Sequence, residues 1–284
     1  MNIPFNRDLS NSVAILTGGA GVLCSCFSEA LASCGCRVAI LDINKEAAER
    51  VANKINDNGG IALAVKGDVL DINSLENAKK EILEEFGKYN ILINGAGGNH
   101  PKGTTSHKFL TKKDLTQEKN TVKTFFDLEK EGIEFVFNLN FLGTLLTTQV
   151  FAKEMINQEG AVIINISSMN SFRPLTKIPA YSAAKAAVSN FTQWLAVYFS
   201  KVGIRVNAIA PGFFLTKQNR ELLIQEDGSF TPRAEKIINR TPLGRFGKPE
   251  DLIGTLLWLL DDKASGFVDG VVIPVDGAFN AYSI

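Results

Sequence analysis

Short, uninterrupted apolar runs alternate along the chain with segments whose apolar positions recur every three or four residues. The runs predict strands at residues 12–16, 37–41, 62–65, 90–93, 161–166, 204–210 and 271–275. The periodic segments predict helices at residues 22–33, 45–56, 74–86, 133–157, 180–200 and 251–260. Asn44 suits the N-cap of the second of these helices.

The predicted strands are apolar at nearly every position rather than at every second one. Strands of this kind are buried on both faces, as in a parallel sheet that helices cover on each side. Because crossovers between parallel strands are right-handed, the pattern predicts a doubly wound α/β fold of Rossmann type with seven strands. A flavodoxin-like fold, or another α/β fold without a dinucleotide, would show the same alternation, so motifs at the strand ends decide between them.

Two segments lack clear periodicity, at residues 99–131 and 213–240. The first holds both histidines, and long loops in compact domains are usually functional or mobile. We interpret it as an insert and the second segment as a variable loop near the substrate. Since no repeat or second domain is apparent, residues 1–284 are expected to form one domain.

Thirty basic and thirty acidic residues cancel, so no charge excess points to a nucleic-acid partner. The first ten residues hold no apolar run typical of a secretion signal, and no segment approaches the roughly 18 apolar residues of a membrane span. We therefore expect a cytoplasmic protein. Four cysteines form two C-x-C pairs, at Cys24, Cys26, Cys34 and Cys36. This spacing is tight for zinc, so small interior side chains are favoured over a metal or disulfide cluster.

A glycine-rich loop, TGGAG, begins at Thr17 directly after the first predicted strand and leads into a predicted helix. Glycines there allow a close approach to a pyrophosphate, which the N–H groups of the helix N-terminus attract. Asp42 ends the second strand 24 positions after Gly18, where a carboxylate can bind ribose hydroxyls and repel a 2′-phosphate. This predicts NAD rather than NADP, although Asp42 could be a solvated strand end and Lys45 or Arg37 could serve a phosphate.

Tyr181 and Lys185 lie four residues apart in a predicted helix and so share one of its faces. Lowering a tyrosine pKa from about 10 to about 7 needs roughly 4 kcal/mol, the order of energy that one ammonium at about 4 Å supplies. Lys185 would thus enable Tyr181 to exchange a proton with a substrate oxygen. The alternative is an ordinary helix tyrosine beside a solvated lysine.

Polar segments end three further predicted strands at the same sheet edge. NGAG begins at Asn94 after the fourth strand, Ser167 and Ser168 end the fifth, and PGFFLT begins at Pro211 after the sixth. Ligands of open α/β sheets bind outside the carboxyl ends of the strands, so these segments should line one crevice.

Together the motifs resemble those of the short-chain dehydrogenases/reductases over residues 13–277. The matching segments are TGGAG at Thr17, DV at Asp68, NGAG at Asn94, NLNFLG at Asn138, NISS at Asn165, YSAAK at Tyr181, PG at Pro211 and VDG at Val275. The chain departs from the usual TGxxxGxG, because Val22 and Cys24 stand where glycines are expected and Gly21 comes one position early. The path of the glycine loop is therefore expected to differ. NGAG also replaces NNAG, and VDGA replaces VDGG, but none of these departures removes a catalytic group.

The resemblance implies a catalytic tetrad of Asn140, Ser168, Tyr181 and Lys185. Tyr181 would be the general acid/base, Ser168 would position the substrate, and Lys185 would also hold the nicotinamide ribose. Asn140 would bend its helix and hold a water that links Lys185 to solvent. Ser168 fits the family pattern better than Ser167, because it precedes Tyr181 by thirteen residues and this spacing is typical of the family.

The resemblance also implies which residues bind the NAD that Asp42 favours. Besides Tyr181 and Lys185, the residues expected to bind it are Gly18, Gly19, Gly21, Val22, Leu23, Asp42, Ile43, Asp68, Val69, Asn94, Ala96, Gly97, Pro211, Gly212, Phe214 and Thr216. Asp68 would flank the adenine, Asn94 would support the central strand, and Thr216 would contact the carboxamide.

Within the family, GVL in the glycine loop, GGNHP after the fourth strand and the long insert resemble the short-chain type of D-mannonate oxidoreductase, or fructuronate reductase. Its substrate carries a carboxylate, which needs a cation or several donors. Arg173 is the first candidate, followed by Asn99, His100 and Lys102. The alternatives are another polyol or aldonate dehydrogenase, such as gluconate 5-dehydrogenase, and a non-catalytic NAD-binding sensor. Members of the family are usually homotetramers or homodimers, so the same is expected here.

Overall fold

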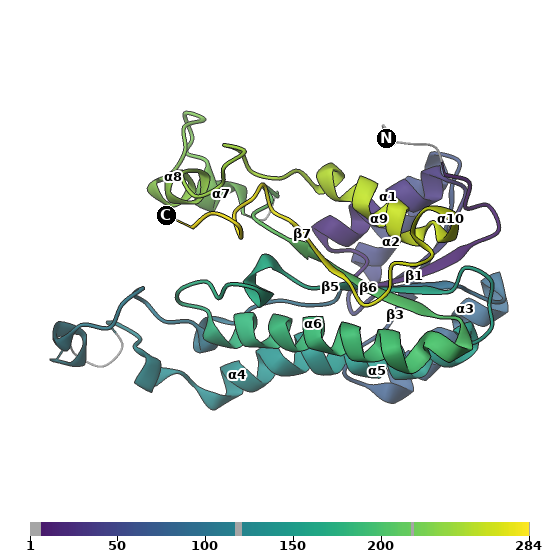
Figure 1. The fold of residues 1–284 in the computed structure, drawn as a ribbon, viewed down its shortest axis with the longest axis horizontal. Coiled ribbons are helices and arrows are strands. Elements are labelled where there is room, and N and C mark those ends of the chain that lie inside the picture. Colours follow the sequence, from purple (N-terminus) through teal and green to yellow (C-terminus); the bar gives the residue numbers. More distant parts are fainter. Residues whose placement is uncertain (1–6, 117–120, 217–218, 284) are drawn as a thin grey trace.

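The computed structural model describes residues 7–116, 121–216 and 219–283, and at its centre lies a seven-stranded sheet (Figure 1). In spatial order the strands are β3 (Ile61–Lys66), β2 (Arg37–Asp42), β1 (Val13–Thr17), β4 (Ile91–Asn94), β5 (Val162–Ile166), β6 (Arg205–Pro211) and β7 (Val272–Val275). Every neighbouring pair is parallel, which confirms the predicted sheet. The strand order reverses between β1 and β4, the place where ligands bind in such sheets.

Helices cover both faces of the sheet (Figure 1). On one face lie α1 (Val22–Ser33), α2 (Lys45–Asp57), α9 (Ile253–Leu260) and α10 (Asp262–Ser265). On the other face lie α3 (Ile72–Phe86), α4 (Lys130–Phe137), α5 (Gly143–Met155) and α6 (Pro179–Phe199). All residues of β1, β4 and β5 are buried, because each strand packs apolar side chains against helices on both faces. The expected doubly wound α/β fold is thus confirmed.

Element boundaries differ from the predicted ones where caps or tight turns intervene. Helix α3 begins at Ile72, two residues early, because the Asp71 carboxylate accepts hydrogen bonds from two N–H groups of its first turn. Asn44 caps α2 as predicted, with its Oδ1 accepting the N–H of Ala47 at 3.0 Å. A 3-10 turn at Pro249–Leu252 stands before α9.

The helix predicted at residues 133–157 starts earlier and is interrupted. It consists of α4, a π-helical turn at Asn138–Leu142, and α5. By length and composition, the segment Lys130–Met155 could cross a membrane, contrary to the sequence-based expectation. Half of its most apolar window is buried inside the fold, however, and the segment packs against α3, α6 and β4 as a core helix does.

The two irregular segments have different structures. The insert forms short 3-10 turns at Pro101–Gly103, Lys112–Thr116 and Phe125–Asp127, and it projects from the body beyond the start of α4 (Figure 1). The loop after β6 contains α7 (Arg220–Leu223) and α8 (Pro232–Ile238). Residues 117–120 of the insert and 217–218 of the loop lie outside the described residues, as do residues 1–6, where the predicted lack of a secretion signal falls.

The four cysteines are free and buried, as the choice of small interior side chains predicts. Burial raises the pKa of Cys24, Cys26 and Cys36 to about 12, which keeps them as neutral thiols.

Candidate active site

The glycine loop after β1 lies against the segment that follows β4. Gly18 has a φ of +59°, and a Cβ there would lie 2.9 Å from the Cα of Ala96, so both the conformation and the space require glycine. The hydroxyl of Thr17 accepts hydrogen bonds from the N–H groups of Gly95 and Ala96 at 3.1 and 3.3 Å. The ends of β1 and β4 are therefore fixed to each other at the switch point.

The loop presents backbone N–H groups and one carboxylate to the same region. Gly21 is the N-cap residue of α1, no side chain caps this helix, and its first turn holds no acidic residue. Its terminal N–H groups can therefore serve an anion. The Asp42 carboxylate accepts the N–H of Ala20 through Oδ2 at 3.1 Å and that of Asn44 through Oδ1 at 3.0 Å. These bonds hold its negative charge beside the loop.

The two departures from the usual family pattern in this region meet in space. A Cβ on Gly95 would overlap the sulfur of Cys24, which is buried in α1. The thiol thus occupies the space left by the missing side chain at position 95. This packing accounts for both the cysteine in the glycine loop and the glycine in NGAG.

Lys185 and Tyr181 lie on one face of α6, as their spacing predicts. The Lys185 Nζ lies 5.8 Å from the centre of the Tyr181 ring, and it donates a hydrogen bond of 2.7 Å to the carbonyl of Ile166 at the end of β5. Burial lowers the pKa of Lys185 to about 8. Burial also raises the pKa of Tyr181, and a hydrogen bond with Ser168 opposes that rise. The expected lowering of the phenol pKa by Lys185 is therefore not found in the protein alone.

Ser168, rather than Ser167, faces the phenol. Ser168 is buried, and its Oγ also accepts the N–H of Asn170 at 3.2 Å. The Ser167 hydroxyl instead donates to the backbone carbonyl of Lys185 and lies 2.7 Å from the hydroxyl of Ser189. These contacts fix the end of β5 against α6. Ser167 therefore stabilises the structure around the site, whereas Ser168 faces the phenol.

Asn140 reaches the same place from the π-helical turn. Its Nδ2 donates to the carbonyls of Gly98 and Val136 at 2.7 and 2.8 Å, and its Oδ1 accepts the N–H of Gly98 at 3.2 Å. A Cβ on Gly97 would lie 2.6 Å from that Oδ1 and 3.1 Å from the Lys185 Nζ. The carboxamide, the ammonium and the bare backbone at Gly97 are thus immediate neighbours.

Asn94 lies beneath this group in a buried polar network. Its Nδ2 donates to the hydroxyl of Thr148 at 3.0 Å and to the Oδ1 of Asn165 at 2.8 Å. Asn165 in turn donates to the hydroxyl of Thr192 on α6 at 2.9 Å. The Asn94 side chain therefore joins β4, β5 and their helices, and its part in a cofactor site is indirect.

The remaining expected cofactor residues surround the sheet edge in different ways. Ile43 is 66% exposed, whereas Val69 is buried and packs against Gly143. The Asp68 carboxylate accepts the N–H of Leu70 at 2.9 Å. Thr216 donates its N–H to the side chain of Asn219.

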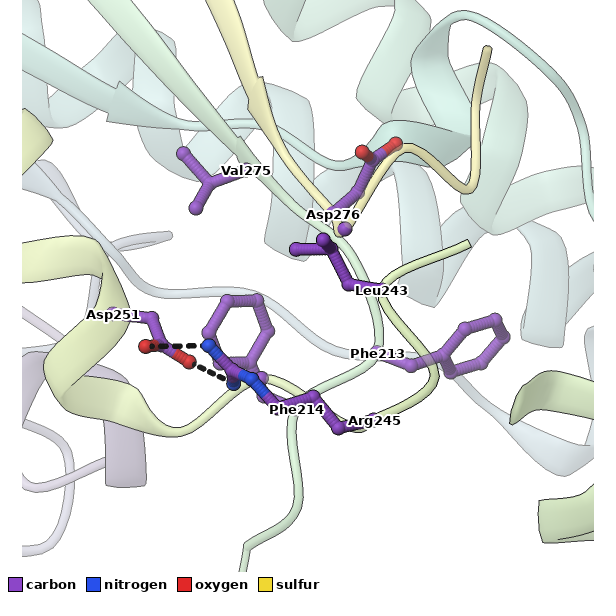
Figure 2. Close-up of a pocket in the computed structure, with 9 residues that line it drawn as sticks. Phe213, Phe214, Leu243, Arg245, Asp251, Val275 and Asp276 are labelled. Carbon is purple, nitrogen blue, oxygen red and sulfur yellow. Dashed lines mark hydrogen bonds and ion pairs between the residues drawn. The ribbon is translucent and has the colours of Figure 1, made fainter. Parts of the chain in front are cut away.

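Phe214 lies beside a cavity of about 250 Å³ at the ends of β6 and β7 (Figure 2). Its side chain is buried in the core and close to Gly247, and its carbonyl accepts a hydrogen bond of 2.8 Å from the Nδ2 of Asn219. Arg245 and Asp251 form a two-pronged ion pair at this cavity, with distances of 2.6 and 3.1 Å (Figure 2).

The expected substrate residues differ in whether their polar groups are free to bind a ligand. Arg173 is exposed, and its Nη1 donates to the backbone carbonyl of Tyr282 at 2.9 Å. The Nδ1 of His100 accepts the N–H of Lys102, and its ring packs against Phe135. Lys102 is also paired with a glutamate of the insert at 2.7 Å. Arg173 consequently keeps its place as the first candidate for a carboxylate.

Asn99, the other expected substrate residue, is exposed and donates to the hydroxyl of Thr104 at 3.1 Å. Two features were not predicted, namely the buried Asn170 and the C-terminal tail that Arg173 contacts. The polar residues that follow β5, namely Ser167, Ser168, Asn170 and Ser171, were the sequence signal for the first of them.

A glycine loop, a buried lysine one turn from a tyrosine, and a serine at a parallel strand end together define a dehydrogenase site on a Rossmann-type sheet. The chain belongs to the short-chain dehydrogenase family, whose sequence profile matches residues 12–227. This confirms the resemblance seen in the motifs.

Individual relatives match nearly the whole chain. It is 58% identical over 283 residues to an uncharacterized oxidoreductase of Haemophilus influenzae, with 100% of this chain and 98% of the relative covered. It is 32% identical to the 2-dehydro-3-deoxy-D-gluconate 5-dehydrogenase of Dickeya dadantii, with 96% and 97% covered. A crystal structure from Haemophilus influenzae, provisionally assigned as a D-mannonate oxidoreductase and containing NAD, superposes with a TM-score of 0.92 at 57% identity, with 98% of each chain covered.

Proposed function

We propose that this protein is an NAD(H)-dependent oxidoreductase that interconverts a sugar-acid ketone and its alcohol, with D-fructuronate and D-mannonate as the substrate pair. The observation that carries the proposal is the grouping of the Tyr181 phenol, the Ser168 hydroxyl and the buried Lys185 at the carboxyl end of β5. The structural match to the NAD-containing protein assigned as a D-mannonate oxidoreductase supports the choice of cofactor and substrate.

The residues around the glycine loop fit NAD(H). The uncapped N-terminus of α1 suits a pyrophosphate, and the Asp42 carboxylate suits ribose hydroxyls while opposing a 2′-phosphate. Gly97 leaves the space next to Lys185 free of a side chain. When bound, the nicotinamide supplies or accepts the hydride.

The protein side chains hold the substrate oxygen and transfer the proton. During ketone reduction, Ser168 donates a hydrogen bond to the substrate oxygen, and Tyr181 donates its phenolic proton to the same oxygen. Because burial raises the pKa of Tyr181, the phenol stays protonated at neutral pH, which suits an acid. Alcohol oxidation needs the phenolate, so its rate should rise with pH while reduction is favoured near neutrality.

The sugar-acid assignment rests on Arg173 together with the similarity to relatives. This guanidinium follows Ser168 by five residues, and it retains donors beyond the one bound to the Tyr282 carbonyl. A substrate carboxylate could accept two parallel hydrogen bonds from this planar guanidinium. The identity to a 2-dehydro-3-deoxy-D-gluconate 5-dehydrogenase keeps another aldonate dehydrogenase as the second candidate.

Initial rates with D-fructuronate, 5-ketogluconate and neutral ketoses, each with NADH and with NADPH, test the proposal. We expect D-fructuronate with NADH to give the highest kcat/KM. Preference for neutral ketoses would remove the carboxylate argument, and preference for NADPH would refute the role given to Asp42.

Tyr181→Phe distinguishes an enzyme from a non-catalytic NAD-binding sensor. The variant lacks the proton donor but keeps the ring, so turnover should fall by at least about 100-fold while NADH binding, followed by fluorescence, stays within twofold. Full activity in this variant would show that another group moves the proton.

We also propose that the protein forms a homotetramer or homodimer. Three large apolar side chains on α6, Trp194, Val197 and Tyr198, are 54%, 76% and 66% exposed, and such patches commonly mark interfaces. Light scattering of the purified protein tests this, and a monomer at micromolar concentration would contradict it.

A further inference from the structure

The segment after Ser168 holds a buried asparagine that lacks a hydrogen-bond partner for one of its atoms. Asn170 lies in the 3-10 turn Met169–Ser171 and is 5% exposed, and its carboxamide Oδ1 is buried without a partner. Its backbone is fixed, because its N–H donates to the Ser168 Oγ and the Ser171 hydroxyl donates to the Ser168 carbonyl at 2.8 Å. The side chain is thus held two residues from the serine that contacts the phenol.

An unpaired buried carboxamide oxygen destabilises the folded protein, so its persistence calls for a functional reason. Other unpaired buried atoms among the described residues include the carboxamide oxygens of Asn94 and Asn280 and the hydroxyls of Ser28, Thr147 and Ser182. The hydroxyls can rotate toward a carbonyl of their own helix, and Asn94 is already held by the two hydrogen bonds that its Nδ2 donates. Of the unpaired carboxamides among the described residues, that of Asn170 is the one two residues from the serine that contacts the phenol. A bound ligand group would supply the missing donor.

The segment that holds Asn170 contacts the C-terminal tail. Three residues further on, Arg173 holds the C-terminal tail through the carbonyl of Tyr282. The tail also packs the ring of Phe279 against that of Phe213, directly after β6, with 5.2 Å between ring centres. The segment with Asn170, the tail and the end of β6 therefore adjoin one another on the side of the sheet edge where the phenol lies.

We propose that Asn170 determines substrate specificity by binding a hydroxyl group on a carbon next to the reacting carbonyl of a polyhydroxylated substrate. This inference rests on the proposed function and adds the group that recognises the hydroxyl. A hydroxyl donates to the free Oδ1 and can accept from the Nδ2, so it satisfies the carboxamide in full. The hydrogen bond between Asn170 and Ser168 sets this contact at a fixed place relative to the serine and phenol that hold the reacting oxygen.

The test compares Asn170→Ala with Asn190→Ala, which changes an exposed asparagine of α6. The two substrates are D-fructuronate and 3-oxobutanoate, which keeps a ketone and a carboxylate but has no hydroxyl groups. For Asn170→Ala, kcat/KM with D-fructuronate should fall by roughly 5- to 150-fold, the range for a buried group left unpaired. The effect on 3-oxobutanoate should stay within twofold, measured as kcat/KM or, where turnover is too slow, as its inhibition constant against D-fructuronate.

A purely structural role gives a different result. Asn170→Ala removes an unpaired buried oxygen, so Tm should stay unchanged or rise, and NADH binding should match that of Asn190→Ala. Equal losses with both substrates, a lower Tm, or an unchanged kcat/KM with D-fructuronate would each overturn the inference.

The proposed function can fail separately from this inference. If the wild-type protein prefers a neutral ketose, the sugar-acid assignment is wrong. The same comparison is then made with that ketose and a hydroxyl-free ketone of equal length, and its outcome still decides the role of Asn170.

Discussion

Replacing Lys185 with methionine should stabilise the protein at neutral pH while abolishing turnover. Burial lowers the pKa of this lysine from its ordinary value of 10.5 to about 8. Keeping the charge buried therefore costs about 3 kcal/mol below pH 8. Methionine removes that cost but leaves the carbonyl of Ile166 unpaired, at about 1–2 kcal/mol, so Lys185→Met should raise the free energy of unfolding by about 1–2 kcal/mol.

The pH dependence separates this explanation from a simple packing effect. A lysine with a lowered pKa binds its proton less tightly in the folded state, so its cost is complete below the folded pKa and disappears as the pH rises through 10.5. The advantage of the variant should shrink by about 2 kcal/mol between pH 6.5 and 9.5. Urea unfolding of the cofactor-free protein, followed by circular dichroism, measures it.

The matched control is Lys201→Met, which changes an exposed lysine just after α6. Its effect on unfolding should be the same at both pH values. If Lys185→Met instead showed a constant difference from wild type at pH 6.5 and 9.5, the buried charge would not be the source of the change.

Three further predictions concern the cofactor end of the site. Asp42→Ala removes the carboxylate that opposes a 2′-phosphate, so the ratio of kcat/KM for NADH to that for NADPH should fall at least about tenfold; an unchanged ratio would contradict this. In Gly97→Ala, the added methyl group crowds the Lys185 ammonium and the Asn140 carboxamide, so kcat should fall about 100-fold. In the control Gly98→Ala, the added Cβ meets no atom closer than 3.5 Å, so activity should be kept. Cys24→Gly and Gly95→Ala should each destabilise the protein by about 1–3 kcal/mol, and thermal unfolding of the double variant should show a loss smaller than their sum by about 1–2 kcal/mol; strict additivity would refute their contact.

The sheet could be predicted because its strands are apolar at every position and punctuated by polar ends. Each strand end identified from sequence, including Asp42 and Ser168, lies at the carboxyl edge of the observed sheet. The interruption of the long helix at Asn138–Leu142 does not follow from periodicity, and only the family resemblance, which implied that Asn140 bends its helix, pointed to it. It accompanies the bonds between Asn140 and Gly98, which lie 42 residues apart, and local periodicity contains no trace of such a contact.

In the candidate site too, some features follow from local sequence spacing, and others depend on residues that are far apart in the sequence. Helical spacing correctly places Tyr181 and Lys185 on one face, but it does not reveal that Nζ bonds to the carbonyl of Ile166. Nor does spacing reveal burial, which outweighs the hydrogen bond with Ser168 and raises the pKa of the phenol. The tuning of an acid depends on what surrounds it, so it follows only from the packed structure.

The paired departures at positions 24 and 95 show why single motifs can mislead. Taken alone, a cysteine in the glycine loop suggests an altered loop path, and a glycine in NGAG suggests a weakened strand end. Because β1 and β4 are neighbours, helix α1 brings the thiol of Cys24 onto the bare backbone of Gly95. Each residue fills or vacates the space that the other requires, and interiors packed this closely tolerate a changed volume only where a neighbour compensates. The loop can thus keep its place beside Asp42 without the third glycine, and the two departures are one structural change rather than two defects in a cofactor site.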